Sequence, residues 1–440
     1  MNMIDTKIPR RIASSLLQSL TAGVVPRSGL EYINAGRKHE ISALLSDLET
    51  VSDGGAACRF LVGRYGSGKS FLLGLIRNLA LEKGFVVCDC DLSPERRFTG
   101  SRGQGLATYR ELLHNLSVKT KPEGGALSLL LQRWLSQLML QTAEEYPEKE
   151  ETFRNEKVKE KVRKVISKME HMVFYYDFAK VMECYLQGYF EADDGKCDLA
   201  LRWIRGEYET RTEAKKALGV GSIITDENWY DCLKLLAFFV VGAGYRGLIL
   251  LVDELVNLYK IPQTVTRQSN YEKILTIFND TLQGKAAHFA IYFCATPQLM
   301  DDTRRGLAGY EALRSRLASG RFVKEGYRDL FGPVIRLDPL TNEELMILCE
   351  NLQKLHASFY QTEEKLTGGE LAGFLQTELS RIGADSLLTP REITRDLLEI
   401  LNLLQQNPDA TLQDILGGFS FAATSSDKEE IPDDFADFTI

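Results

Sequence analysis

The sequence contains 440 residues, of which 44% are hydrophobic and 26% are charged, and it carries a formal net charge of −8. These proportions are typical of a soluble globular chain, and the length is sufficient for two or three domains with a sizeable core. The negative charge argues against a generally basic, nucleic-acid-coating protein, although it leaves room for a local basic channel.

Two helices are predicted ahead of the first strand. The first lies in a helical docking segment, residues 1–32, where apolar side chains recur at helical spacing: Ile12, Leu16, Leu17 and Leu20. The second helix runs over residues 36–48, with Arg37 at its start. Arg37 could touch a nucleotide or a neighbouring protein, but most arginines in such positions are solvated, so we expect a surface group.

The chain shows no sign of secretion or membrane insertion. Its N-terminus lacks the basic-then-apolar order of a signal peptide, and no apolar run approaches the roughly eighteen residues of a membrane helix. We therefore expect a cytoplasmic protein without membrane contact. The eight cysteines are scattered, which argues against a zinc site or a disulfide framework.

A phosphate-binding loop is predicted at residues 63–70, which fit the pattern GxxxxGK[ST]. A short, β-prone apolar run (58–62) precedes the loop, and residues with helical spacing (71–81) follow it, which is the context that the motif requires. The loop consists of Gly63, Arg64, Tyr65, Gly66, Ser67, Gly68, Lys69 and Ser70.

This loop predicts a site for ATP and Mg²⁺. Its glycines let backbone N–H groups turn inward around phosphates, and the following helix N-terminus adds a partial positive charge. Lys69 would reach the β- and γ-phosphates, and Ser70 would offer its hydroxyl to Mg²⁺. We assign residues 33–105 to the first part of a nucleotide-binding domain.

A long helical block follows the second predicted strand (85–91). We expect a mobile segment at residues 100–105 and then a helical insertion over residues 106–243. Within the insertion the expected helices span residues 127–142, 156–169, 172–190, 199–218 and 229–241. Acids and bases alternate over residues 154–168, which is typical of an exposed, salt-bridged face; contact with a partner or a nucleic acid is the alternative.

The strand predicted at residues 247–254 supplies the second half of the nucleotide site. It is apolar and ends in Asp253 and Glu254. In phosphate-loop NTPases such an Asp holds Mg²⁺, usually through a bound water, and an adjacent Glu can orient and deprotonate the attacking water. The stretch between Lys69 and Asp253 is far longer than one crossover needs, so we expect the insertion to cover one edge of the sheet.

Two further strands complete the nucleotide-binding domain, whose second part spans residues 244–338. The strand at 288–297 ends at Thr296, a polar residue that could lie beside the γ-phosphate. Arg314 and Arg316 follow on a short segment, and the last strand spans residues 332–337.

A small helical bundle is predicted over residues 339–417. Its helices span residues 341–359, 369–382 and 389–405, and the last of them begins with a Pro followed by Arg391, which is a helix-start signal. We expect the acidic tail at 418–440 to be disordered.

In this order the parts resemble an AAA+ ATPase of the origin-recognition branch. Shorter motifs at residues 23–26, 36–37, 60–70 and 332–337 resemble the ATP-binding BrxD proteins of BREX phage-defence systems. The resemblance covers most of residues 33–405. It implies an α/β phosphate-loop NTPase with a parallel sheet, a large helical insertion between the second strand and the Walker B strand, and a C-terminal helical lid.

The resemblance also assigns roles to single residues. Lys69 and Ser70 match the Walker A lysine and hydroxyl, whereas Asp253 and Glu254 match the Walker B metal and catalytic carboxylates. Thr296 matches the sensor 1 residue, although the commoner residue there is Asn.

Two arginines complete the implied site. Arg316 is the choice for the arginine finger, with Arg314 as its rival, and Arg391 matches the sensor 2 arginine of the lid. A finger acts on the neighbouring subunit, so the resemblance implies a homo-oligomer. Other defence-system proteins are implied partners, and DNA is possible.

The resulting hypothesis is a BREX-type ATPase that couples ATP hydrolysis to assembly or remodelling of a DNA-associated complex. One alternative is an ATP-gated switch or scaffold with little turnover. Another is an initiator-like DNA-loading factor, although no winged-helix domain is evident after the lid.

Overall fold

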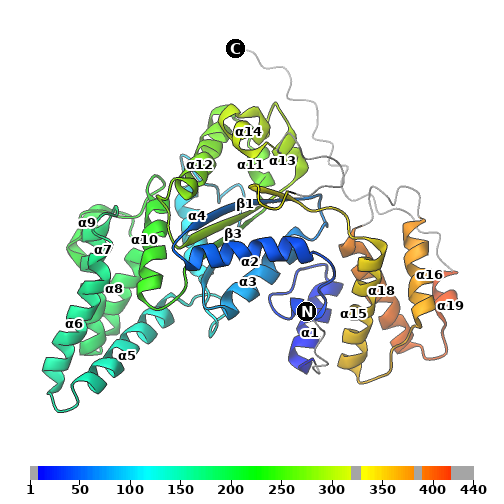
Figure 1. Ribbon diagram of the computed structural model, residues 1–440, viewed down its shortest axis with the longest axis horizontal. Helices are drawn as coiled ribbons and strands as arrows, with labels where there is room; N and C mark the ends of the chain where they lie inside the picture. The colour runs from blue at the N-terminus through cyan, green and yellow to red at the C-terminus, as the bar shows by residue number, and fades with distance from the viewer. Residues whose placement is uncertain (1–7, 319–328, 381–388, 418–440) are drawn as a thin grey trace.

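The computed structural model describes residues 8–318, 329–380 and 389–417. Within them, five parallel strands form one central sheet in the order β2-β3-β4-β1-β5 (Figure 1). The strands are β1 (Ala56–Val62), β2 (Val86–Asp91), β3 (Leu248–Asp253), β4 (Phe289–Ala295) and β5 (Val334–Arg336). β4 lies between β1, which leads into the phosphate loop, and β3, which ends at Asp253. Because the strands are parallel, the ends of β1 and β3 lie at the same edge of the sheet, on either side of β4.

Helices cover both faces of the sheet, as a parallel sheet requires. On one face lie α2 (Lys38–Ser52) and α3 (Lys69–Glu82), packed on side chains such as Leu61 and Leu251. On the other face lie α4 (Gln104–His114), α10 (Trp229–Gly242) and α12 (Thr264–Leu282), packed on Phe60 and Phe293 among others. All seven residues of β4 are buried, which places this strand at the centre of the core.

The predicted helical insertion lies between β2 and β3. Besides α4 and α10, it contains α5 (Leu127–Glu145), α6 (Glu151–Ser167), α7 (Tyr175–Glu191), α8 (Asp194–Ile204) and α9 (Arg211–Leu218). Figure 1 shows α5 to α9 extending away from the sheet. Their core is continuous with that of the α4 and α10 face; for example, the rings of Trp134 and Phe239 are 5.1 Å apart.

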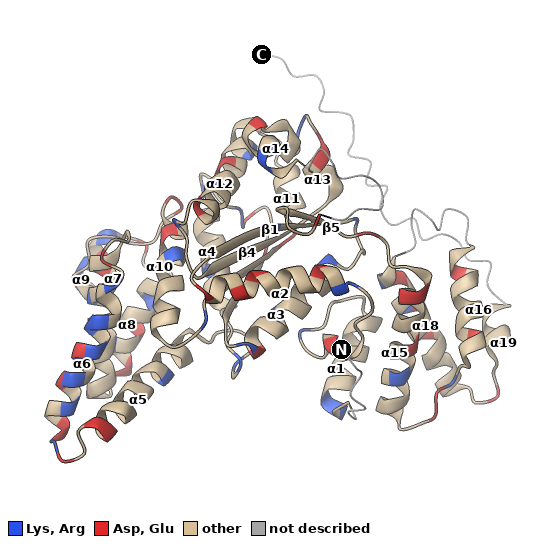
Figure 2. Cartoon of the chain, in the orientation of Figure 1, with Lys and Arg blue, Asp and Glu red and all other residues tan. Residues whose placement is uncertain are grey.

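Charges on α6 follow the predicted pattern. Lys, Arg, Asp and Glu alternate along the helix in Figure 2. Two ion pairs lie on its own surface, Lys157 with Glu160 and Lys159 with Glu156. The segment is an exposed, salt-bridged face.

Two predictions within the insertion need correction. The single helix expected over residues 199–218 is wrong, because Gly206 adopts a left-handed φ of +70° after α8, and the Thr210 hydroxyl accepts a hydrogen bond from Glu213 N at the start of α9. The segment 100–105, expected to be mobile, is held by Asp226, whose carboxylate accepts hydrogen bonds from Gly100 N at 2.8 Å and Gly105 N at 2.6 Å.

The helix α12 was not predicted from the sequence. Its buried face includes polar side chains, which interrupt the apolar spacing that marks a helix. Asn270, one of them, is fully buried and accepts hydrogen bonds from the backbone N–H groups of Phe98 and Thr99. A long-range contact therefore accounts for a polar residue in the core.

Among the described residues, four helices at the C-terminal end form the lid, which lies beside the sheet in Figure 1. They are α15 (Asn342–Tyr360), α16 (Gly368–Leu379), α18 (Pro390–Gln406) and α19 (Leu412–Leu416). The N-terminal helix α1 (Arg10–Thr21) and the short turn η1 (Leu30–Tyr32) join the same apolar core. Both ends of the described chain thus build one unit, and the predicted α/β fold with its insertion and lid is confirmed.

Short elements connect the remaining strands: α11 (Val256–Tyr259), α13 (Pro297–Asp301), η2 (Leu307–Gly309) and α14 (Glu311–Leu317). The predicted acidic tail and the end of the helix expected over residues 369–382 lie outside the described residues. Among the described helices, none has the length and apolar character needed to span a bilayer.

Candidate functional site

The loop between β1 and α3 is shaped to receive an anion. Gly63 N donates to Ala295 O at 3.1 Å, which ties the start of the loop to the end of β4. Gly66 and Gly68 have left-handed φ values of +74° and +91°, a conformation that suits glycine. A Cβ added at Gly68 would meet no atom within 4 Å. The first N–H groups of α3 therefore border open space, an arrangement that binds phosphate groups.

The Walker A and Walker B side chains meet at this loop. Ser70 Oγ donates to Asp253 Oδ2 at 2.5 Å, and Asp253 Oδ1 accepts a hydrogen bond from Glu254 N at 2.7 Å. Lys69 Nζ donates to the backbone carbonyls of Gly63 and Arg64, at 2.9 and 2.8 Å. Desolvation lowers the pKa of Lys69, against the opposing influence of the nearby carboxylates. Residues almost two hundred positions apart thus form one cluster, as the motifs predict.

Glu254 is held in an unusual conformation at the edge of this cluster. Its φ is +56°, and a left-handed conformation costs a residue with a Cβ roughly 1–2 kcal/mol. Such strain persists where surrounding contacts enforce it, often at functional sites; here the next residue, Leu255, donates its N–H to Cys294 O. Desolvation raises the pKa of Glu254, and repulsion by Asp253 and Asp91 raises it further.

Asp91 is a site residue that the sequence analysis missed. It ends β2 and lies opposite Asp253 in the strand register. Desolvation raises the pKa of Asp91, and Asp253 adds to the shift. Its position as the last residue of a predicted strand, like that of Asp253, was the available signal.

The cluster has the chemistry of a Mg²⁺ site. Mg²⁺ prefers oxygen ligands and usually keeps several waters. Because the Ser70 hydroxyl donates its proton to Asp253, its lone pairs are available to a cation. Ser70 could therefore bind Mg²⁺ directly, with Asp253 acting through a bound water.

A cavity of about 220 Å³ opens at the phosphate loop. One end is polar and includes the loop together with Asp253 and Glu254. The other end is apolar and is built by the N-terminal segment and the lid, including Val24, Val25 and Leu348. A polar end beside an apolar end matches a nucleotide, whose phosphates and base differ in the same way.

The lid rests directly on the phosphate loop. Arg391 NH1 donates to the Tyr65 hydroxyl at 2.5 Å, and its guanidinium lies 5.2 Å from the centre of the Tyr65 ring. A Cβ added at Gly66 would approach Thr389 Oγ1 within 2.7 Å, and one added at Gly23 would approach Arg391 within 3.2 Å. The predicted sensor arginine therefore lies where loop, lid and N-terminal segment meet.

Arg37 lies in the cavity, which corrects the expectation of a solvated surface group. Its side chain is only 9% exposed, and its NH2 donates to Ser67 O at 3.1 Å. It also lies 3.7 Å from the buried Glu40 carboxylate. The sequence reasoning missed this role because nothing local distinguishes Arg37 from an exposed arginine.

Gly63 and Arg64, at the start of the loop, do not line this cavity among the described residues, and neither do Thr296, Arg314 and Arg316. The Thr296 hydroxyl accepts a hydrogen bond from Leu299 N at 3.3 Å and so caps α13. Arg314 and Arg316 are exposed on α14, which lies far from the lid in Figure 1. Arg316 Nε donates to Asn279 Oδ1 at 3.0 Å.

No curated protein matches this chain. The model of one protein family, described as the BREX system ATP-binding protein BrxC/D, matches residues 8–419. This match spans nearly all of the sequence, confirms the resemblance to BrxD proteins that the motifs indicated, and supports an ATP-binding role for the chain in phage defence. The chain therefore belongs to the BrxC/D family of BREX system ATP-binding proteins.

Proposed function

We propose that the protein hydrolyses ATP in this cavity and couples turnover to the assembly or remodelling of a DNA-associated complex of the defence system. The contact between Ser70 and Asp253 carries the proposal, because it brings a hydroxyl, a carboxylate and the neighbouring Glu254 to the open start of α3. A phosphate loop by itself supports only the binding of a nucleotide. Glu254, beside the Ser70 and Asp253 pair that would hold Mg²⁺, supports hydrolysis, because its carboxylate can activate the water that attacks the γ-phosphate.

Each side chain of the cluster would have a distinct role. Lys69 would exchange its bonds to loop carbonyls for bonds to phosphate oxygens. Ser70 and Asp253 would hold Mg²⁺, which offsets negative charge on the γ-phosphate when it is bound. Glu254 would accept the proton of the attacking water, and its raised pKa makes it a stronger base than an ordinary glutamate.

The arginine finger would come from a second copy of the chain. Arg316 is exposed on α14 and is not among the described residues that line the nucleotide cavity, as expected of a residue that serves a neighbouring subunit. Its bond to Asn279 involves a neutral amide, so the guanidinium keeps its charge uncompensated by that partner. The active assembly would therefore be a homo-oligomer, and other BREX proteins would be its partners.

One observation favours the second candidate, an ATP-gated switch with little turnover. The Thr296 hydroxyl caps α13, so it is not available in this conformation to position a water beside the γ-phosphate. A slow chemical step would follow. The protein would then act mainly through the difference between its ATP-bound and ATP-free states.

Phosphate release by the purified chain, with and without DNA, tests the proposal. Wild type should release phosphate in the presence of ATP and Mg²⁺, and Glu254→Gln should bind ATP but lose turnover because an amide cannot accept the proton. Glu363→Gln, at an exposed lid position, is the matched control and should behave as wild type. Unchanged turnover in Glu254→Gln would refute the assignment, and tight ATP binding without release in wild type would favour the switch.

A further inference from the structure

A second, larger cavity of about 720 Å³ lies at the root of the helical insertion. It runs along α4 from Gly103 to His114. Its other walls come from the loop before α4, the segment after α4, and the loop after α8, which contributes Arg205. The nucleotide cavity shares none of these lining residues.

This basic cavity carries an excess of positive charge in an acidic protein. Four arginines line it, against two glutamates, whereas the whole chain has a net charge of −8. The two glutamates are matched to two of the arginines: Glu111 lies 3.3 Å from Arg96, and Glu207 lies 3.8 Å from Arg205. The remaining two arginines determine what the cavity can bind.

Arg102 and Arg110 have no carboxylate partner among the described residues. Arg110 Nε donates to the backbone carbonyl of Gly206 at 2.8 Å, and Arg102 is exposed. Arg96 adds an unmet donor, because its buried Nε makes no hydrogen bond to the described residues. Leaving a buried donor unsatisfied is unfavourable, so an incoming acceptor would be stabilised here. Guanidinium groups suit phosphate oxygens in particular.

The shape of the basic cavity indicates a chain of phosphates. The stretch of α4 from Gly103 to His114 is about 16 Å long at 1.5 Å per residue. Each strand of a duplex has a phosphate roughly every 3.4 Å along the axis. An extended single strand spaces its phosphates more widely, and this length still spans more than one of them. The described lining includes no Phe, Tyr or Trp, and His114 is its one imidazole ring, so its polar groups are mainly guanidinium donors for phosphate oxygens.

We infer that the basic cavity binds the phosphodiester backbone of a single DNA strand through its arginine side chains. The inference deepens the proposed function and rests on it, since it gives the DNA of the proposed complex a place on this chain.

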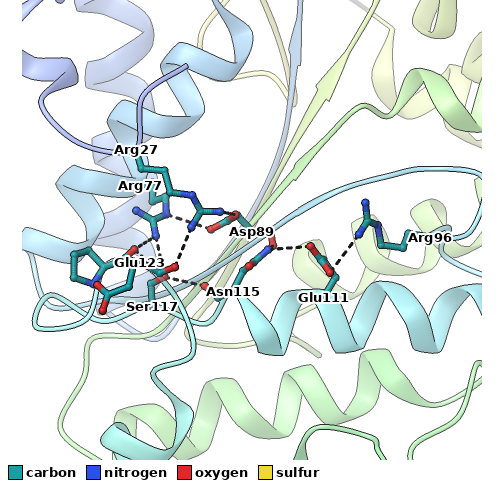
Figure 3. A network of polar contacts seen from close by, with 9 residues as sticks. Arg27, Arg77, Asp89, Arg96, Glu111, Asn115, Ser117 and Glu123 are labelled. Atoms are coloured by element: carbon teal, nitrogen blue, oxygen red, sulfur yellow. Dashed lines mark hydrogen bonds and ion pairs between the residues drawn. The ribbon is translucent and has the colours of Figure 1, made fainter. Parts of the chain in front are cut away.

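A chain of polar contacts leads from the basic cavity to Arg27 and to Arg77 on α3 (Figure 3). Glu111 accepts a hydrogen bond from Asn115 Nδ2 at 3.4 Å, and the same amide donates to the Asp89 carbonyl at 2.9 Å. The Asp89 carboxylate lies 3.2 Å from Arg77 on α3 and 3.2 Å from Arg27, which directly follows the segment that lines the nucleotide cavity. A DNA phosphate bound at Arg96 would therefore compete with Glu111 for the Arg96 guanidinium, at one end of this chain.

Charge reversal at Arg102 tests the inference. Arg102 makes no side-chain contact within the described residues, so Arg102→Glu should leave the fold intact. Arg211→Glu is the matched control, because Arg211 is also exposed, lies in the same insertion and makes no ion pair with the described residues. Arg102→Lys keeps the charge. The probe is a fluorescein-labelled oligothymidine strand, and its anisotropy reports binding to the full chain without ATP or Mg²⁺.

Wild type should bind the strand, and Arg102→Glu should bind about five- to tenfold more weakly, with a salt slope smaller by about 0.7 between about 50 and 200 mM salt. Arg211→Glu and Arg102→Lys should match wild type. The inference fails if wild type does not bind, if both charge reversals weaken binding equally, or if a duplex or inorganic triphosphate competes as well as the strand. Since the assay needs no hydrolysis, its failure would leave phosphate release, and thus the proposed ATPase, untouched.

Discussion

Gly66→Ala should separate the lid from the phosphate loop. The added Cβ would lie 2.7 Å from Thr389 Oγ1 and 2.9 Å from Thr389 Cγ2, closer than atoms can pack. Thr389 is the N-cap of α18, where it forms a reciprocal capping box with Glu392. The new methyl group must therefore displace the start of the helix that carries Arg391.

Gly68→Ala supplies the reference for the size of the effect. Both glycines have left-handed φ values, so either substitution carries a backbone cost of roughly 1–2 kcal/mol. Only Gly66→Ala adds overlap, since a Cβ at Gly68 meets nothing within 4 Å. Overpacking costs roughly 1–3 kcal/mol. In Gly66→Ala this cost would lower the protection of the amides in the first turn of α18 against hydrogen exchange by about 5- to 150-fold relative to Gly68→Ala.

Hydrogen exchange in the nucleotide-free protein measures this difference. Peptides that contain residues 390–394 should exchange faster in Gly66→Ala than in Gly68→Ala, whereas peptides from α7 in the insertion should be unaffected. Thr389→Gly removes the atoms that overlap, and glycine at an N-cap costs only a few tenths of a kcal/mol relative to threonine. The double variant Gly66→Ala with Thr389→Gly should therefore exchange like Thr389→Gly alone.

Equal exchange in the two glycine variants would refute this reasoning. So would a double variant that exchanges as fast as Gly66→Ala, because the overlap with Thr389 would then not be the cause. Either result would mean that the lid is held by its core with α1 alone, and that its contact with the loop contributes nothing measurable.

Three further predictions concern ATP binding, turnover and stability. Lys69→Ala should lose binding of a fluorescent ATP analogue while its circular dichroism is unchanged, since the Lys69 ammonium contacts loop carbonyls at the site; equal affinity would contradict its role. Arg316→Ala should bind ATP but turn over about 10³-fold more slowly. Mixing it with Lys69→Ala should restore some phosphate release, and a mixture that co-assembles but stays inactive would exclude a finger acting between subunits. Because the pKa of Glu254 is raised, the folded state binds its proton more readily than the unfolded state does. Turnover should therefore fall as the pH drops through the raised pKa of Glu254. Glu254→Gln should also unfold at a higher urea concentration than wild type at neutral pH, because the amide carries no charge to desolvate. An equal or lower urea midpoint in Glu254→Gln would contradict the raised pKa.

The parts of the site that follow strands and helix starts were predictable from sequence. The phosphate loop and the Asp253 pair are local patterns, and parallel strands bring their ends to one edge, so Ser70 and Asp253 were expected to meet. The fold class was implied by the resemblance to AAA+ ATPases that these motifs carry. A strand end alone was not sufficient, because Asp91 was missed and Thr296 caps α13 without lining the cavity.

Residues that act through distant contacts were not predictable. Arg37 lines the cavity because Glu40 and the Ser67 carbonyl hold it there, and its own spacing indicated only a surface. Likewise, Thr389 looked like an ordinary helix cap, although it lies against Gly66. Asn270 broke the apolar pattern of α12 because its partners lie on the other side of the insertion in sequence.

The shared core of α1 and the lid sets an order of events during synthesis. The apolar side chains of α1 pack with α15 and α18, which are translated more than three hundred residues later. At roughly 5–20 residues per second, α1 would wait on the order of 15–65 s for its partners. The apolar end of the nucleotide cavity is built from these same two regions. A nascent chain therefore cannot acquire a complete nucleotide cavity until α15 and the start of α18 have left the ribosome.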